Sequence, residues 1–407
     1  MKEIVIENQR IINGGGVNVV FAATKALLPY FKGNEFNAEY SMPVENLPYG
    51  IGVIPFVCNV LPIVWLTDAT LRLEELDEDF YNSIADFKRG YEEMYPNLQF
   101  KGKIECKRIV KHQPLCNENR SLVFFSGGVD AFATLFAHIN EKPTLFSICG
   151  ADIALSNKRG WANVQRQIDD VGAKFGLSTI QCYSNFREFI DEEKLCDLVA
   201  SLGAKDDWWH GFQHGIGLIG HAAPLAYQYG YMTNYIASSY TIRERPYITC
   251  ASDPRIDNFV QFCGAKVCHD QFEYNRQEKI HHVVDYSQSI NKPIMLRVCW
   301  IASEGENCCK CEKCKRTIFG LLAAGADPND FGFVLSDRDI RRLVREIKWK
   351  DIIPTHILIL WKDIQEDVTR STNNDKRLRW LYWYNFERWN EWKTQYVKIK
   401  RRIRKLI

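Results

Sequence analysis

Strand patterns and helix patterns alternate along the middle of the chain, from about residue 117 to residue 325. Leu122–Phe125 is a continuous apolar run, typical of a strand buried on both faces. A helical stripe follows, with apolar residues at the spacing of one helix face from Phe132 to Ile139. The further strand candidates, separated by helical patterns, are Thr144–Cys149, Ser178–Tyr183, Tyr231–Ala237, Ala265–His269 and Ile294–Trp300. The alternation predicts an α/β fold with a doubly wound, mainly parallel sheet.

The two flanking regions follow other patterns. Residues 1–116 contain one helical stretch, near Asp79–Tyr95, among short β-like runs at Glu3–Ile6, Val17–Phe21, Pro62–Thr67 and Leu98–Ile109. Residues 326–407 have helical patterns. We therefore predict three parts: a β-rich accessory domain (1–116), a Rossmann-like core (117–325) and a helical C-terminal extension (326–407).

Composition places the chain among ordinary globular proteins. It is 46% hydrophobic and 25% charged, which excludes a mainly disordered protein. The start, MKEIVIENQR, lacks the basic-then-apolar order of a signal peptide. The longest apolar stretch, Ile51–Leu66, is too short to span a bilayer and is interrupted by Pro55, Asn59 and Pro62. We therefore expect a cytoplasmic protein with no membrane partner.

The net charge of +2 conceals an uneven distribution. The C-terminal segment Lys376–Ile407 contains 11 Lys or Arg and 2 Asp or Glu, a net of +9, so the rest of the chain carries −7. Trp380, Trp383, Trp389 and Trp392 are interleaved with these basic residues. One interpretation is a terminal helix that packs on the body, with a solvated basic end. Another is a surface for nucleic acid or an acidic protein partner, and a membrane-surface helix is a third.

The most informative segment for function is Ser126-Gly127-Gly128-Val129-Asp130, between the first buried strand and its helix. The two glycines allow a tight turn and the close approach of a ligand to the backbone. The N–H groups of such a turn and helix start form an anion site suited to phosphate. Ser126 offers a hydroxyl, and Asp130 can cap the helix or hold a cation that neutralises phosphate. A strand–turn–helix joint that uses the glycines for geometry alone is the alternative.

Five of the 14 cysteines fall between Cys299 and Cys314. In a long chain without a signal peptide, such clustering indicates a metal in a reducing compartment. Cys299, Cys308, Cys311 and Cys314 supply four thiolates within one short segment, which suits tetrahedral zinc, and Cys309 could replace Cys308. Free thiols, an iron–sulfur cluster and a redox pair are alternatives. The basic residues expected to offset the charge of the cluster are Lys310, Lys313, Lys315 and Arg316.

The segment Phe125–Ala131, with the sequence FSGGVDA, resembles the SGGxDS pyrophosphate loop of the N-type ATP pyrophosphatases, which adenylate a substrate and release pyrophosphate. Ala131 stands where that pattern ends in serine, so one hydroxyl donor is lost. The loop, a strand ending in cysteine and a CxxCxxC that opens the helix Arg316–Leu322 follow the order of the 7-cyano-7-deazaguanine synthase family in particular. This resemblance covers about residues 120–325. More loosely, the extended chain resembles synthase-like paralogues associated with bacterial antiphage defence.

The resemblance implies an enzyme that uses ATP to activate a carboxylate, such as 7-carboxy-7-deazaguanine, as its acyl-adenylate. The loop Ser126–Asp130 would hold the phosphates with Mg²⁺, and the four cysteines would hold a structural Zn²⁺. An amine would then attack to give an amide. In the synthase family the amine is ammonia and a second ATP dehydrates the amide to a nitrile, whereas the additional regions of this chain could present a protein amine.

Two residues outside these motifs are further candidates. Arg276 follows a predicted strand, where it could clamp a carboxylate or phosphate bidentately or form a surface ion pair. Asp152 follows the second strand of the predicted core and is placed to face the adenosine.

Two other functions remain open from the sequence. A tRNA-thiolation enzyme of the same superfamily would need a reactive cysteine pair, which the clustered cysteines could supply. A catalytically silent subunit that binds nucleotide or nucleic acid would fit both Ala131 and the basic tail. The oligomeric state is not determined by the sequence, with a dimer as one possibility.

Overall fold

A computed structural model describes residues 2–12, 15–299, 301, 304–371 and 375–404. The chain forms two compact units, each built from segments far apart in the sequence. The first unit consists of Met1–Ser126, Ala137–Ser238 and Thr249–Phe272, and the second of Gly127–Phe136, Ser239–Ile248 and Glu273–Ile407.

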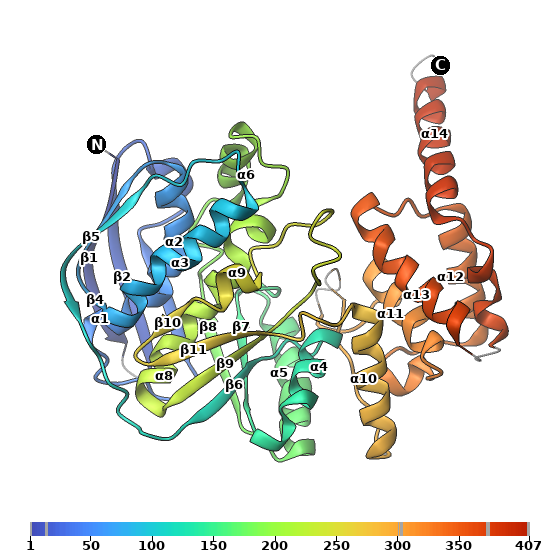
Figure 1. The fold of residues 1–407 in the computed structure, drawn as a ribbon, viewed down its shortest axis with the longest axis horizontal. Coiled ribbons are helices and arrows are strands. Elements are labelled where there is room, and N and C mark those ends of the chain that lie inside the picture. Colours follow the sequence, from blue (N-terminus) through green and yellow to red (C-terminus); the bar gives the residue numbers. More distant parts are fainter. Residues whose placement is uncertain (1, 13–14, 300, 302–303, 372–374, 405–407) are drawn as a thin grey trace. The chain divides into compact units, whose positions relative to one another are not determined.

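The first unit is built on an 11-stranded sheet in the order β10-β11-β9-β6-β7-β8-β3-β2-β1-β4-β5 (Figure 1). Most neighbouring strands are parallel; the antiparallel pairs are β1 with β2, β2 with β3, β3 with β8 and β10 with β11. The prediction of an α/β chain with a large, mostly parallel sheet is therefore confirmed. The strands are β1 (Glu3–Ile12), β2 (Gly16–Ala23), β3 (Glu35–Tyr40), β4 (Thr70–Asp77), β5 (Lys103–Val110), β6 (Arg120–Phe124), β7 (Thr144–Cys149), β8 (Thr179–Ser184), β9 (Tyr231–Ala237), β10 (Gln261–Phe262) and β11 (Ala265–Asp270).

Five parallel strands at the centre of this sheet have a Rossmann-like order. The chain runs from β6 outward through β7 and β8, then returns to the other side of β6 for β9 and β11. Val123 of β6 accordingly pairs with Leu145 of β7 on one side and Tyr235 of β9 on the other. Such a reversal of strand order creates a switch point at the carboxyl ends of the two inner strands, where ligands bind in open α/β sheets. The chain leaves β6 through Ser126 at this point.

The strands of residues 1–116 continue the same sheet. β3 pairs antiparallel with β8 through Ala38 and Ser184, and β2, β1, β4 and β5 follow outward. The N-terminal strands therefore belong to one sheet with the predicted core, and residues 1–116 lie in the same compact unit as most of that core.

Capping residues at the helix ends explain where some helices of the first unit begin and end. The long amphipathic helix α5 starts after Asn157, whose side chain accepts a hydrogen bond from the Gly160 N–H, and ends at Gly176 with φ +66°. Asp77 caps α3 in the same way, accepting from Phe80. The helices are α1 (Tyr49–Gly52), α2 (Ile54–Leu66), α3 (Glu78–Met94), α5 (Lys158–Phe175), α6 (Glu192–Ser201), α7 (His214–Ile219), α8 (Ala223–Tyr229) and α9 (Pro254–Asp257).

Two predicted strands are wrong. Pro62–Thr67 lies at the end of α2, a helix in which every residue is buried; a short run that is apolar throughout does not distinguish a buried strand from a buried helix. The segment predicted as a strand at Ile294–Trp300 has no regular structure over residues 292–299, and Trp300 lies outside the described residues. Among the described residues, no helix is both long and apolar enough to cross a membrane.

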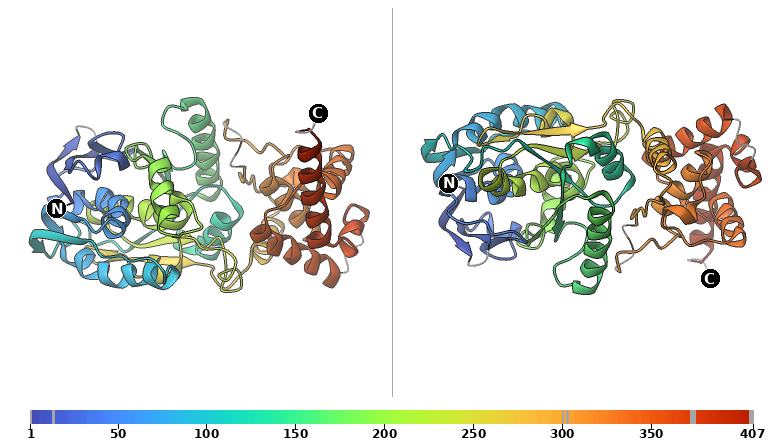
Figure 2. Two further views of the ribbon diagram at one scale, coloured as in Figure 1. Left: turned by 90° about the horizontal axis from the view of Figure 1, so that it is seen from above. Right: turned by 90° about the horizontal axis from the view of Figure 1, so that it is seen from below.

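The second unit is mainly helical, and the helices of its C-terminal part pack against one another (Figure 2). α10, α11 and α13 are in mutual contact, and α13 also contacts α14 and the short 3₁₀ helix Lys376–Tyr382. Large aromatic side chains, among them Trp361, Trp380 and Phe386, fill the space between them. Helices therefore occupy the region where the sequence predicts a helical extension. They are α4 (Val129–Ala137, all but its last residue in this unit), α10 (Arg276–Ser289), α11 (Glu312–Ala323), α12 (Asp337–Trp349), α13 (Leu358–Arg370) and α14 (Phe386–Arg404).

Candidate functional site

The glycine loop after β6 has the backbone geometry of a tight turn into a helix. Gly127 adopts φ +76°, a conformation that favours glycine. The Gly128 carbonyl accepts a hydrogen bond from the Phe132 N–H at 3.0 Å, which starts α4, and the Gly127 carbonyl accepts from the Arg297 N–H at 2.7 Å. The first N–H groups of α4 have no partner within their own helix, as at every helix start. The loop therefore has the form of an anion site.

A largely buried ion pair fixes the first acidic residue of α4. The Arg276 guanidinium donates to Oδ2 of Asp130, and their side chains are 9% and 15% exposed. Arg276 is the first residue of α10, whose N-terminus is closed by a capping box between Asn275 and Glu278. Asp130 Oδ1 and Arg276 Nε are buried and have no hydrogen-bond partner among the described residues. Arg276 thus forms an ion pair that is largely buried, and its predicted clamp on a carboxylate or phosphate of a ligand stays a prediction.

Arg316 is a further buried cation of this unit. It pairs with Glu312 one turn earlier on α11, at 2.8 Å, while its Nη1 is buried without a hydrogen-bond partner in the part of the chain that the structure describes. Burial opposes its charge, but the attraction of Glu312, with smaller contributions from Tyr240 and Asp130, raises the pKa of Arg316. From the sequence, Arg316 was expected only beside the cysteines. Nothing in the sequence signals that Arg316 is buried, because its burial depends on how α11 packs in the folded chain.

The remaining loop residues and Asp152 have different surroundings. Ser126 is exposed just beyond β6, and Val129 is fully buried, so that only its backbone can serve a ligand. Asp152 is exposed in the bend that follows β7, in the first unit. Its predicted contact with adenosine stays a prediction.

The four cysteines predicted as metal ligands form one cluster. The sulfur atoms of Cys299, Cys308, Cys311 and Cys314 all lie within 4.8 Å of one another. The Cys299–Cys311 and Cys308–Cys314 sulfur pairs are each 3.9 Å apart. Tetrahedral zinc with Zn–S bonds of about 2.3 Å requires sulfur separations of about 3.8 Å. The cluster could therefore bind a metal such as zinc.

Asn307 takes the place of the expected strand in positioning Cys299. Its side-chain oxygen accepts from the N–H groups of Val298 and Cys299, at 2.9 and 3.3 Å, and its amide donates to the carbonyls of Leu296 and Gly332. The segment that carries Cys299 is thereby tied to the CxxCxxC turn without a strand partner among the described residues. Sequence reasoning had no signal for this role, because it depends on contacts formed only in the folded chain.

The CxxCxxC turn presents its sulfurs to backbone donors. Cys308 Sγ accepts from the N–H groups of Lys310 and Cys311, at 3.4 and 3.3 Å, and Cys311 Sγ caps α11 by accepting from the Cys314 N–H at 3.4 Å. Hydrogen bonds to thiolates stabilise their charge. The Sγ atom of Cys309 lies 3.6 Å from the Asn307 carbonyl and outside the cluster, so the structure places Cys308, and not Cys309, among the four candidate ligands.

The cysteines of the cluster shift the pKa values of one another. The hydrogen bond from the Cys314 side chain lowers the pKa of Cys311 to about 5, and the same interaction raises the pKa of Cys314. Two of the four neighbouring cations form ion pairs with carboxylates: Lys315 with Glu346 and Asp351, and Arg316 with Glu312. That the four cations offset the charge of the cluster stays a prediction.

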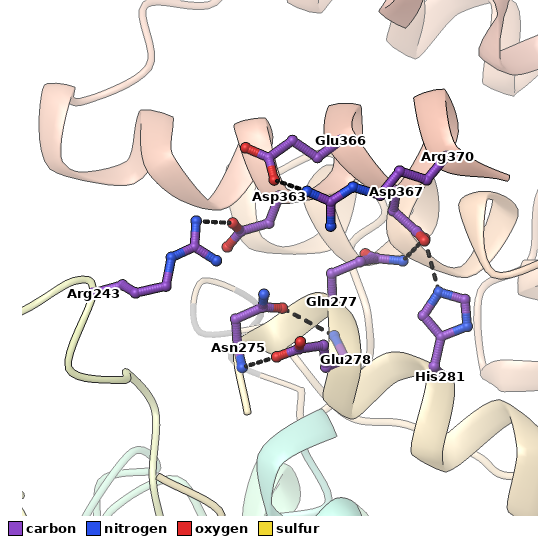
Figure 3. Close-up of a pocket in the computed structure, with 9 residues that line it drawn as sticks. All are labelled: Arg243, Asn275, Gln277, Glu278, His281, Asp363, Glu366, Asp367 and Arg370. Carbon is purple, nitrogen blue, oxygen red and sulfur yellow. Dashed lines mark hydrogen bonds and ion pairs between the residues drawn. The ribbon is translucent and has the colours of Figure 1, made fainter. Parts of the chain in front are cut away.

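A polar pocket of about 310 Å³ lies near the start of α10 (Figure 3). Asp363 pairs with Arg243 at 3.3 Å, and Asp367 accepts from Gln277 and pairs with His281 at 2.8 Å. Carboxylates outnumber arginines in the lining, which consists of Arg243, Asn275, Gln277, Glu278, His281, Asp363, Glu366, Asp367 and Arg370.

Asp363 is the unusual carboxylate of this pocket. It is 4% exposed, and its Oδ2 has no hydrogen-bond partner within the described ranges. Burial raises the pKa of Asp363 to about 6, and the attraction of Arg243 only partly opposes this. Sequence reasoning missed this residue, since a single Asp on an amphipathic helix carries no distinguishing pattern.

Comparisons with protein-family models, with curated proteins and with solved structures give no match for this chain. Its fold and sites define an α/β protein with a large, mostly parallel sheet, a Rossmann-like central strand order and a four-cysteine cluster that could bind a metal.

Proposed function

We propose that the chain is an ATP-dependent enzyme that adenylates a carboxylate and then transfers the acyl group to an amine. The observation that carries this proposal is a group of buried polar atoms without partners among the described residues, on side chains that accompany the glycine loop in the second unit: Asp130 Oδ1, Arg276 Nε and Arg316 Nη1. Buried polar groups are normally hydrogen-bonded, so their lack of partners fits a missing polar ligand. Two cations and a carboxylate suit a polyphosphate with its divalent ion.

In the first step, an oxygen of the substrate carboxylate attacks the α-phosphorus of ATP and pyrophosphate leaves. The backbone N–H groups after Gly127 would hold the leaving phosphates. Arg276 and Arg316 would offset the negative charge that develops there, and Asp130 would hold the Mg²⁺ that neutralises the phosphates when bound. Most of the rate enhancement would then come from positioning and charge neutralisation.

In the second step, the amine nitrogen attacks the acyl carbon and AMP leaves, which gives an amide. Asn275 and Gln277 in the lining of the polar pocket flank Arg276 in the chain, which connects this pocket with the proposed phosphate site. Because carboxylates outnumber arginines in the lining, the pocket suits an amine as the second substrate. An ammonium group would pair with Oδ2 of Asp363. Its raised pKa makes Asp363 a stronger base than an ordinary carboxylate, so it could accept the proton that the nitrogen releases.

The cysteine cluster has a structural part in this proposal. The four cysteines would fill all four coordination positions of a tetrahedral zinc ion, as in structural zinc sites, so none would be left for a substrate. From the sequence resemblance, we propose a 7-deazaguanine carboxylic acid as the substrate, in an activity connected with antiphage defence. The amine would be ammonia or a protein amine, and a nitrile would require a second ATP.

The deciding experiment is a pyrophosphate-release assay of the purified protein. ATP, Mg²⁺ and 7-carboxy-7-deazaguanine should give pyrophosphate, and mass spectrometry should identify the amide formed with each candidate amine. Pyrophosphate release that instead depends on tRNA and a sulfur donor would identify a thiolation enzyme. ATP binding without pyrophosphate release under any of these conditions would identify a catalytically silent subunit.

Asp363→Asn should weaken the amine step and leave adenylation intact. In the wild type, the Asp363 carboxylate is ionised above about pH 6, so the apparent affinity for the amine should fall as the pH drops through that value. The groups facing it are Arg243, Glu244, Glu278 and Glu366. The asparagine variant should lose this pH dependence. We would measure the KM for the amine between pH 5 and 8 with a saturating acid; an unchanged profile in the variant would remove Asp363 from the amine site.

Deletion of residues 398–407 should leave adenylation of a small free acid unchanged. Lys398, Ile399 and Lys400 are exposed near the end of α14, whereas Lys393, shortly before the cut, is buried and donates to the Ile347 carbonyl. Residues 405–407 of this predicted basic tail lie outside the described residues. Pyrophosphate release by the truncated and full-length proteins should therefore agree. A folded truncated protein without turnover would place the tail at the active site.

A further inference from the structure

We propose that a groove between α12 and the 3₁₀ helix Lys376–Tyr382 binds single-stranded nucleic acid. The groove has a volume of about 430 Å³. It belongs wholly to the second unit and shares no residue with the loop, the cysteine cluster or the polar pocket as described above. The lining consists of Ile340, Arg341, Val344, Arg345, Lys376, Arg377, Arg379, Trp380 and Trp383.

Four cations of the groove are available to a partner. Arg341, Arg345, Lys376 and Arg379 are exposed, and within the described part of the chain none of them forms an ion pair. Four carboxylates of this part of the chain form ion pairs with other cations: Asp339 with Arg342, Glu346 with Lys315, and Asp337 and Asp375 with Arg377. The uncompensated positive charge fits a polyanion, whose phosphates would replace solvent around these side chains.

Aromatic rings accompany this charge. Trp383 is 60% exposed, and the ammonium group of Lys348 lies 4.4 Å from its ring centroid. From Trp383, ring contacts run through Tyr384, Trp389 and Trp392 to Tyr396 along α14, with centroid separations of 6.5, 6.2, 5.8 and 5.6 Å. Trp392 and Tyr396 are about half exposed and stacked nearly parallel. Flat exposed rings beside phosphate-binding cations are the two components of sequence-tolerant single-strand binding.

The surface includes part of the basic C-terminal segment and extends beyond it. The sequence attributes the positive charge to the terminal residues, whereas two of the four available cations, Arg341 and Arg345, come from α12, before the tail begins. A paired duplex hides its base faces, so exposed indole rings favour unpaired strands. The proposal concerns binding alone and does not depend on the proposed adenylation.

The test is fluorescence anisotropy of the full-length protein with labelled oligothymidylate and oligouridylate of about 16 nucleotides. The wild type should bind at least one of them, with an affinity that falls between about 50 and 200 mM salt. Which of the two binds more tightly separates DNA from RNA. Arg341→Glu/Arg345→Glu should lose about tenfold or more in affinity, and Trp383→Ala about fivefold or more. Quenching of tryptophan fluorescence by the oligonucleotide should be smaller in Trp383→Phe than in the wild type.

The matched control is Lys25→Glu/Lys32→Glu, which changes the net charge by the same amount at two exposed lysines of the first unit. This control should bind as tightly as the wild type. The proposal is overturned if the wild type binds neither oligonucleotide, if the control loses as much affinity as the groove variant, or if only deletion of residues 398–407 abolishes binding. Binding restricted to duplexes, to acidic peptides or to anionic vesicles would overturn it as well.

Discussion

Cys311→Ser should remove the bound metal and destabilise the second unit more than any of the other substitutions. Purified wild-type protein should contain about one zinc per chain. In small zinc domains, the metal supplies about 10 kcal/mol or more of folding free energy. Loss of even about 4 kcal/mol would lower the melting temperature by roughly 8–16 °C. Metal analysis and a thermal melt followed by circular dichroism would measure both effects.

Cys309→Ser is the matched control for this prediction. Cys309 is adjacent to Cys308, but its sulfur lies outside the cluster, so the variant should retain the zinc and melt with the wild type. Metal-free wild-type protein that melts like the zinc-loaded form would contradict a structural zinc site. Absorption in the visible range from an iron–sulfur cluster would contradict zinc.

Asp130→Asn should reduce pyrophosphate release by about a hundredfold or more, because it removes a charge where the proposed reaction needs one. The asparagine keeps the size of the side chain but cannot ionise, so it no longer attracts a divalent cation. It also leaves Arg276 buried without its ionic partner. Calorimetry with Mg·ATP, alongside a thermal melt, would separate lost binding from lost folding. Unchanged ATP affinity in a folded variant would reject the assignment of the loop.

Two further variants serve as comparisons for Asp130→Asn. Asp170→Ala removes an exposed carboxylate of α5 and should leave pyrophosphate release unchanged. Ala131→Ser restores the hydroxyl of the resembling loop pattern and should be tolerated, since Ala131 lies on the regular backbone of α4. Inactivity of a folded Ala131→Ser variant would mean that the buried surroundings of this methyl group have no room for one more atom.

Local sequence signals predicted the parts of the fold that depend on neighbouring residues. β7 and β9 have the predicted bounds, because their apolar runs end at turn residues. α5 follows its apolar stripe to the glycine that ends it. The cysteine cluster was also predictable, since the short segment from Cys299 to Cys314 brings four thiols together almost regardless of the rest of the fold.

Elements that depend on distant partners were not predictable in this way. The sequence pattern predicts a strand at the end of the helix that closes at Leu66, because a wholly buried helix has no polar face to reveal its period. The apolar residues before Cys299 predict a strand, yet the Asn307 side chain forms hydrogen bonds with the backbone of this segment in place of a neighbouring strand. The joining of the N-terminal strands to the core sheet rests on the pairing of β3 with β8, two strands that lie far apart in the sequence.

The sequence by itself determined the α/β class, the glycine turn and the four candidate metal ligands, because each arises from residue types at short spacing. Only the tertiary structure decided which charges lie together and which are left without partners. It buries Arg276 against Asp130 across 146 positions of the chain and pairs Lys315 with Asp351. It leaves Arg341 and Arg345 exposed in a groove. The physical reason is that charge pairing and burial depend on distance in space, and folding sets those distances independently of separation along the chain.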